Sequence, residues 1–281
     1  MQVLLGADHS QLQSKTIERS SRRTVSFHLE KWYLDCITES GDGAICYSAL
    51  LEWKHVSFSY ASFLTFDKAG LRQKTSLLNE KQPEQTLAGL VWQSDGLHAR
   101  GLWQAASEIL GAMTLYQGEM GKVRWHCVQP VSSVDLTIGT SHYTGLGYAE
   151  RLEMTVEPWK LPIDELRWGR FLSENAYMVW IQWRGPLPIT MLFCNGELAE
   201  RAEISTNGVC WDKGKLLISN TETLREGPII STALANIPLL GSLLPGSFHK
   251  AYECKWQGFG ELRQGNEVHT GWVIHEIVQF Q

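Results

Sequence analysis

No apolar stretch of the 281-residue sequence reaches the roughly 18–20 residues that a helix needs to span a bilayer. The longest candidate, residues 230–248, is interrupted by Asn236, two prolines and two glycines. It is either an apolar loop or a lid that makes peripheral contact with a membrane or with an apolar ligand. The first 23 residues lack a basic segment ahead of an apolar one, so we expect no secretory signal and a cytoplasmic location.

The sequence also lacks the motifs of several enzyme classes. It has no G-x-S-x-G elbow, P-loop or Rossmann glycine fingerprint, which argues against common hydrolases, kinases and NAD-dependent enzymes. None of the six cysteines forms a C-x-x-C pair, so zinc-type spacing is absent. We expect reduced thiols, although Cys36 and Cys46 could bridge a hairpin in an oxidising compartment.

Charge excludes another class of partner. The formal net charge is −5, which gives no electrostatic reason to expect nucleic-acid binding. A metal site would need several ligands on one face, and the spacing of His28, Glu30 and His142 does not support one. The sequence therefore predicts neither a metal nor a cofactor.

Alternating apolar and polar residues dominate what is present. Residues 24–37, TVSFHLEKWYLDCI, alternate and are followed by ESGDG, in which Gly-Asp-Gly is a hairpin signal. Similar units recur to give about fifteen strands, which predicts an all-β fold of antiparallel strands. Only residues 104–111 and 160–168 have the pattern of short helices.

About fifteen strands exceed the eight of a single small barrel. We therefore predict two β-barrel-like halves that divide near residue 140, where TIGTSHYTGLG is weakly apolar and rich in glycine. The expected organisation is an N-terminal extension over 1–22, one domain over 23–140 and another over 141–281. Twelve tryptophans, an unusually high share, suit large cores or a cavity for a bulky apolar ligand.

The strand over residues 148–156 carries the main candidate acid. Its alternation places Tyr148, Glu150, Leu152 and Met154 on one largely apolar face. A carboxyl group there should have a raised pKa, which suits donation of a proton to an alkene or polarisation of a carbonyl. The alternative is that Glu150 forms a structural ion pair with Arg170.

Two further strands offer candidates. His28, Glu30 and Trp32 share a face that either lines a cavity or forms the outer, partly solvated side of the strand. Near the C-terminus, Trp272 and Glu276 share a face, which makes Glu276 a second candidate for a buried acid.

Several of these stretches resemble signatures of the AttH and carotenoid 1,2-hydratase (hydroxyneurosporene synthase-like) family. The matching residues are His28, Glu30, Trp32-Tyr33 and Asp42-Gly43, then Gly145-Leu-Gly-Tyr148-Ala-Glu150, Trp168-Gly169-Arg170-Phe171, and GWVIHEIVQF with Glu276. Hydratase members carry Tyr-x-Asp-His-Asn-Trp-Gly in the second signature, whereas here Glu150 replaces the aspartate and His-Asn-Trp is absent.

The resemblance implies a tandem pair of lipocalin-like (calycin) β-barrels with a cavity for large apolar, often polyene, substrates. It also implies hydration of an alkene or, as in distant relatives, Diels–Alder-type ring closure. The alternative is a carrier that binds a hydrophobic small molecule without turnover. We predict Glu150, Tyr148 and His28 as catalytic residues. The predicted ligand-binding residues are Glu30, Trp32, Tyr33, His142, Trp168, Arg170, Trp180, Trp272 and Glu276.

Overall fold

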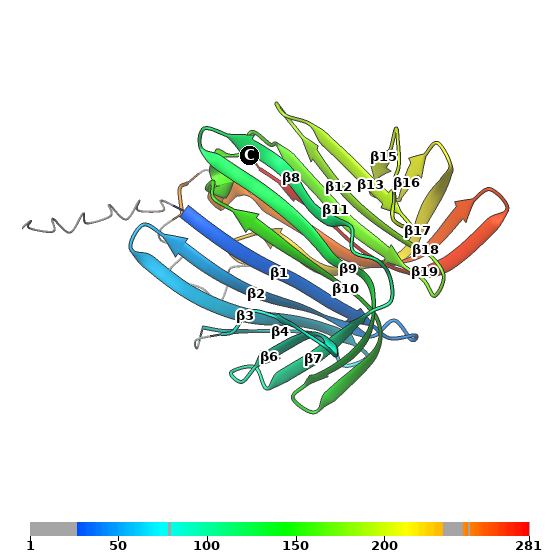
Figure 1. The fold of residues 1–281 in the computed structure, drawn as a ribbon, viewed down its shortest axis with the longest axis horizontal. Coiled ribbons are helices and arrows are strands. Elements are labelled where there is room, and N and C mark those ends of the chain that lie inside the picture. Colours follow the sequence, from blue (N-terminus) through cyan, green and yellow to red (C-terminus); the bar gives the residue numbers. More distant parts are fainter. Residues whose placement is uncertain (1–26, 78–79, 233–243, 247, 281) are drawn as a thin grey trace, which may run out of the picture.

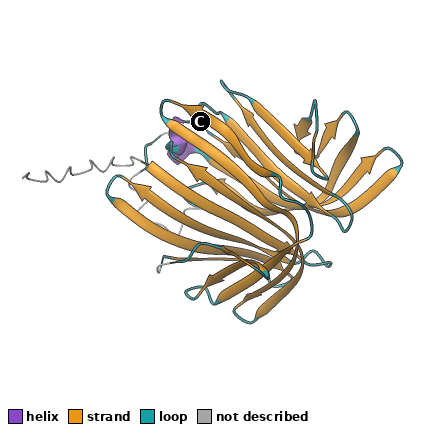
Figure 2. Ribbon diagram, in the orientation of Figure 1, coloured by secondary structure: helices purple, strands orange, loops and turns teal. Residues whose placement is uncertain are grey.

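The computed structural model of the protein describes residues 27–77, 80–232, 244–246 and 248–280. The predicted extension over 1–22 and most of the apolar segment 230–248 lie outside these residues, so the expectations for them remain untested. Nearly every described element is a β-strand, which confirms the all-β class (Figure 2).

Two curled antiparallel sheets make up the fold (Figure 1). The first has the order β4-β3-β2-β1-β10-β9-β7-β6-β5, with β8 paired to β9. Its strands are β1 (Phe27–Ile37), β2 (Gly43–Trp53), β3 (Val56–Asp67), β4 (Gly70–Ser76), β5 (Glu84–Thr86), β6 (Gly89–Ser94), β7 (Ala99–Ala105), β8 (Gly111–Gly118), β9 (Gly121–Ile138) and β10 (Ser141–Met154).

The second sheet has the order β14-β13-β12-β11-β19-β18-β17-β16-β15. Its strands are β11 (Glu165–Leu172), β12 (Tyr177–Arg184), β13 (Ile189–Cys194), β14 (Glu197–Leu198), β15 (Glu203–Ser205), β16 (Gly208–Trp211), β17 (Gly214–Pro228), β18 (Tyr252–Gln264) and β19 (Glu267–Gln279). Each sheet is curled like a half-barrel and keeps two edge strands, since no described pairing joins β4 to β5 or β14 to β15. The fold is therefore the two-domain, lipocalin-like architecture, with open sheets in place of closed barrels.

The sheets divide between Met154 and Glu165, and not near residue 140. The glycine-rich stretch there is a tight turn followed by β10, which pairs with β1 and β9 of the first sheet. Gly145 and Gly147 are required because a Cβ atom at either position would lie about 2 Å from a carbonyl oxygen of β1. The glycines thus mark a close crossing of strands, and they do not mark a linker.

The two predicted α-helices are absent from the described residues. Residues 104–111 contain the end of β7 and the connection to β8, and residues 165–168 belong to β11. The helical elements are the one-turn 3₁₀ helices η1 (Pro158–Lys160) and η2 (Phe248–Lys250). Pairing of β11 between β12 and β19 outweighs the weak helical preference of this short segment. No helix in the described part of the chain has the length and apolar character to cross a membrane.

Three apolar cores hold the molecule together. One fills the concave side of the first sheet and includes the free thiols of Cys36 and Cys46. Another fills the concave side of the second sheet. The largest lies between the sheets and takes residues from both, among them Tyr33 and Tyr148 from the first and Trp168 and Trp183 from the second.

A buried ion pair crosses this central core. Asp35 of β1 accepts a hydrogen bond of 2.9 Å from Arg170 of β11, and both side chains have no exposed surface. Asp35 also accepts bonds from the Tyr33 hydroxyl (2.9 Å) and the Tyr148 backbone N–H (3.1 Å). Desolvation raises the pKa of Asp35 despite Arg170 and these donors. Such a pair fixes how the two sheets meet more than it adds net stability.

The β1–β2 hairpin makes a second link between the sheets. The Gln257 side chain of β18 donates to the Gly41 carbonyl at 2.6 Å. Gly41 has a φ of 91°, and a Cβ atom there would overlap the Trp272 indole. The predicted Gly-Asp-Gly turn is therefore present, and its glycine also lets the hairpin pack against β19.

Breaking the Asp35–Arg170 pair on one side should destabilise the protein strongly. Arg170→Met leaves a buried carboxyl without its cation, and Asp35→Asn leaves a buried guanidinium without its anion. We expect each to lower the free energy of unfolding by about 3–5 kcal/mol in urea denaturation.

The double variant Asp35→Asn/Arg170→Met is the critical control. It removes both charges, while the asparagine keeps an acceptor for Tyr33 and Tyr148. We expect it to be more stable than either single variant. Additive losses would show that the two side chains do not act as a pair.

Candidate functional site

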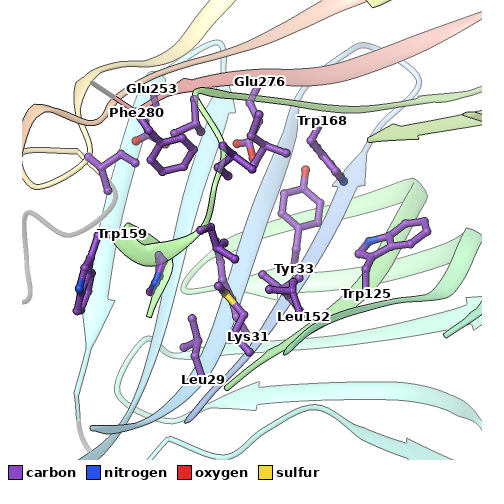
Figure 3. Close-up of a pocket in the computed structure, with 18 of the residues that line it drawn as sticks. Leu29, Lys31, Tyr33, Trp125, Leu152, Trp159, Trp168, Glu253, Glu276 and Phe280 are labelled. Atoms are coloured by element: carbon purple, nitrogen blue, oxygen red, sulfur yellow. The ribbon is translucent and has the colours of Figure 1, made fainter. Parts of the chain in front are cut away.

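A cavity of about 310 Å³ lies between the two sheets, within the central core. Phe27 and Tyr33, six residues apart on β1, both line it. Six residues of a strand span about 20 Å. Figure 3 shows Trp159 at one end of the cavity, and Tyr33, Trp125 and Trp168 at the other. The cavity is therefore elongated, with ends of different chemical character.

The apolar end is built around Trp159 of η1. The Trp159 ring contacts the rings of Phe27, Trp53 and Phe248 at centroid distances of 6.3, 5.2 and 5.8 Å. These rings come from β1, β2, η1 and η2, so elements far apart in the sequence converge here. Such a surface suits the body of an apolar ligand.

The opposite end is polar, and two cross-strand rows form it. On the first sheet, Tyr33 of β1 lies between Tyr47 of β2 and Glu150 of β10 in the strand register. On the second sheet, the row runs through Arg225, Lys255, Glu276 and Trp168 on β17, β18, β19 and β11.

The two rows face each other at this end of the cavity, and some of their side chains are in contact. The Tyr33 and Trp168 ring centroids are 4.7 Å apart, and the Lys255 Nζ lies 5.2 Å from the Tyr33 ring centroid. Titratable groups from both sheets therefore meet at one level of the structure.

Glu150 is held by three donors on one oxygen. Its Oε2 accepts hydrogen bonds from the Trp125 Nε1 (2.5 Å), the Tyr148 hydroxyl (2.7 Å) and the Trp168 Nε1 (3.0 Å). No hydrogen bond to Oε1 is found among the described residues, and Glu150 lines the cavity. Burial raises the pKa of Glu150, and the three hydrogen bonds oppose that shift only in part. The carboxyl is thus held in place through one oxygen, and its pKa is shifted in the direction that suits a proton donor.

Glu276 is held in the opposite state. It forms an ion pair with Lys255, whose side chain is 2% exposed. Burial alone would raise the pKa of Glu276, but Lys255, Lys31 and Arg225 together lower it. Glu276 is therefore an ionised partner for buried cations, whereas Glu150 favours its neutral form.

Four of the predicted ligand-binding and catalytic residues line this cavity, namely Glu150, Tyr33, Trp168 and Glu276. Tyr148 is fully buried behind Glu150 and contacts it through its hydroxyl group. Arg170 does not pair with Glu150, because its guanidinium is bound to Asp35 and to the Trp272 carbonyl. The alternative explanation for Glu150 is thereby wrong.

His28, Glu30 and Trp32 share one face of β1, as expected, but it is the face turned away from the cavity. His28 lies 3.6 Å from Glu52, and Glu30 accepts from the Trp32 Nε1 and lies 3.5 Å from Arg151. Residues at odd-numbered positions of β1 line the cavity instead. Alternation showed which residues share a face, and it did not show which face meets the second sheet.

The other predicted residues also lie elsewhere. His142 is exposed and contacts Asp135 at 3.1 Å. Trp180 packs in the concave core of the second sheet, against Gly169, while Trp183 on the opposite face of β12 lines the cavity. Trp272 packs against Phe259 and the Gly41 turn.

Sequence reasoning missed Lys255, Arg225, Tyr47 and Trp125, which become neighbours only through strand pairing. Lys31 could have been identified from the sequence, because it is a charged residue on the otherwise apolar face formed by Val25, Phe27 and Leu29. Within the described residues, no group of three or more His, Cys, Asp or Glu side chains is arranged to hold a metal ion. The cavity side chains include three cations but no thiol.

The geometry defines an all-β, two-domain protein with a ligand-sized cavity between lipocalin-like sheets. No family model and no curated protein matches the chain in sequence. Solved structures share its fold. CghA bound to Sch210972 has a TM-score of 0.58 and 10% identity, over 91% of this chain and 89% of CghA.

An AttH-like protein from Nitrosomonas europaea has a TM-score of 0.55 and 12% identity, over 90% of this chain and 93% of that one. Kievitone hydratase from Nectria haematococca has a TM-score of 0.53 and 10% identity, over 89% and 88%. At such low identity, the likeness establishes the shared fold. It confirms the architecture that the sequence motifs implied.

Glu150 and Glu276 should affect stability in opposite ways. The folded-state pKa of Glu276 is lowered, so its contribution is present above the unfolded pKa of about 4.3 and is lost as the pH falls through the folded value. Glu276→Gln should lower the free energy of unfolding by about 3 kcal/mol at pH 7, with a smaller deficit below about pH 4.

Glu150→Gln is the matched variant. The folded-state pKa of Glu150 is raised, so its contribution is present at low pH and is lost as the pH rises through the folded value. We expect this variant to be at least as stable as the wild type at pH 7. Urea denaturation between pH 4 and 8 measures both, and equal losses at pH 7 would contradict the assignment.

Proposed function

We propose that the protein is an enzyme of apolar natural-product metabolism in which Glu150 donates a proton or a hydrogen bond to a polyene-type substrate in the cavity. The observation that carries the proposal is the asymmetry of this carboxyl. Three donors hold Oε2, no hydrogen bond to Oε1 is found among the described residues, and Glu150 lines the cavity. Burial raises the pKa of Glu150, which favours the acidic form needed for proton donation.

Alkene hydration is one reaction that this arrangement supports. Glu150 would transfer its proton to one alkene carbon, and the positive charge would develop on the other. The rings of Trp168 and Tyr33 lie beside Glu150 and would stabilise that charge. A water molecule would then add to the cation and return a proton to the carboxylate, so that the alkene and water give an alcohol.

Ring closure is the other reaction. Here Glu150 keeps its proton and donates a hydrogen bond to a carbonyl group of the substrate, which activates the double bond conjugated to it. Most of the acceleration would come from holding the two reacting ends close together in the elongated cavity. The structural neighbours include CghA in complex with Sch210972 and kievitone hydratase, which supports ligand binding and enzymatic activity in proteins of this fold.

Tyr148 would position the acid. Its hydroxyl donates to the same oxygen as the two indoles, and its side chain is fully buried. It therefore acts through Glu150, with no contact to the substrate.

A carrier function is the competing proposal, and the continuous apolar wall from Phe27 to Trp159 favours it. Binding of a hydrophobic ligand requires only such a wall. Turnover requires Glu150 as well, so one substitution separates the two functions.

Glu150→Gln should abolish turnover and preserve binding. The glutamine keeps an oxygen acceptor for the three donors but has no carboxylic proton to give. We expect a rate loss of at least about 100-fold. Polyene substrates incubated with the protein would be analysed by mass spectrometry, where hydration adds the mass of water and cyclisation leaves the mass unchanged but shifts the retention time.

Trp180→Phe serves as the control. Trp180 lies in the concave core of the second sheet, outside the cavity, so this variant should leave the rate unchanged. The rate should also fall with rising pH as Glu150 loses its proton. If the wild type and Glu150→Gln both bind the ligand and release it chemically unchanged, the carrier function is supported. An unchanged rate in Glu150→Gln would remove Glu150 from the mechanism.

A further inference from the structure

We propose that the cavity's ligand carries an oxyanion, such as a carboxylate or enolate, which binds between Lys31 and Arg225 while its apolar body fills the rest of the cavity and passes Glu150. This inference specifies the substrate class for the site and rests on the proposed function only in using the same cavity.

Three cations surround the ring of Tyr47 at the polar end. The Lys31 Nζ lies 4.9 Å from the Tyr47 ring centroid, the Lys255 Nζ 5.7 Å and the Arg225 Cζ 5.7 Å. They come from β1, β18 and β17, so both sheets contribute to the cluster. Like charges brought together in a desolvated site require compensating anions.

The protein compensates two of these three cations. Lys255 is paired with Glu276, and Arg225 lies 3.5 Å from Glu253. Lys31 has no ion-pair partner within 4 Å among the described residues, and its Nζ lies over the face of the Tyr47 ring. Lys31 lies near enough to Glu276 to lower the pKa of that carboxyl, but it forms no direct ion pair, so its ammonium group stays open to an anionic ligand.

Arg225 offers an unused donor in the same place. Its side chain is 7% exposed, and its Nε has no hydrogen-bond partner among the described residues. A buried donor without an acceptor is costly unless a ligand or water fills the site. Lys31 and Arg225 both line the cavity, so a single oxyanion can satisfy the free charge and the free donor.

The strand register also places the oxyanion relative to the acid. Tyr47 and Glu150 lie on either side of Tyr33, on the strands that flank β1. Two strand spacings amount to about 10 Å. The bond that reacts at Glu150 should therefore lie about 10 Å from the anionic group, a distance that a conjugated chain can span.

Two dyes that differ by one charge test the inference. 1-Anilinonaphthalene-8-sulfonate carries an oxyanion, and N-phenyl-1-naphthylamine is the same ring system without it. Fluorescence titration gives the Kd of each dye for the wild type, Lys31→Met, Lys31→Arg and Lys68→Met. Lys68 lies in the β3–β4 turn, outside the cavity, and controls for the loss of net charge.

We expect the wild type to bind the sulfonate dye more tightly than the neutral dye. Lys31→Met should weaken binding of the sulfonate about tenfold, as one charge-assisted contact is lost, and change the neutral dye less than about twofold. Lys31→Arg should retain most of the affinity, and Lys68→Met should change neither dye.

Equal loss of both dyes in Lys31→Met would show a packing defect and overturn the inference. It is also overturned if the wild type fails to bind the sulfonate, or binds both dyes equally well. These measurements involve no turnover, so they stand apart from the test of Glu150. An inactive Glu150→Gln with an unaffected Lys31→Met would reject the oxyanion site alone.

Discussion

The ion pair between Asp35 and Arg170 is the contact on which the site depends. Asp35 lies two residues after Tyr33 on β1, and Arg170 lies two residues after Trp168 on β11. Because side chains repeat every two residues along a strand, the pair aligns the next inward-facing residues as well. It places the Tyr33 and Trp168 rings 4.7 Å apart, and from there the Trp168 indole reaches Glu150. A contact that adds little net stability thus fixes the position of the acid.

Two glutamates at the same level of the cavity acquire opposite properties from their surroundings. Glu150 has neutral donors on one oxygen and aromatic rings around it, so burial dominates and its pKa rises. Glu276 has Lys255 beside it and two further cations nearby, so its pKa falls. The separation gives one chamber both a carboxyl with a raised pKa and a charged region, as the proposed acid catalysis on an ionic, mostly apolar substrate would require.

Local patterns predicted the parts of the site that lie within one strand. Alternation correctly placed Glu150, Leu152 and Met154 on a single apolar face, and Arg151 with Glu153 on the other. It could not decide which face of β1 meets the second sheet, so His28 and Trp32 were assigned to the cavity in place of Leu29 and Lys31. Lys255 and Arg225 join Glu276 only through register between strands far apart in sequence. The glycines near 140 suggested a boundary because a close strand crossing and a linker have similar composition.

The central claim is that the folded protein raises the pKa of the Glu150 carboxyl within the cavity. Its most direct test is ¹³C NMR of the protein labelled at glutamate carboxyl carbons, with the Glu150 resonance assigned by its absence from Glu150→Gln. The account predicts that this resonance titrates above the ordinary glutamate pKa of about 4.3. Titration at or below that value would show that the cavity does not raise the pKa of Glu150, and would contradict its proposed role as a proton donor.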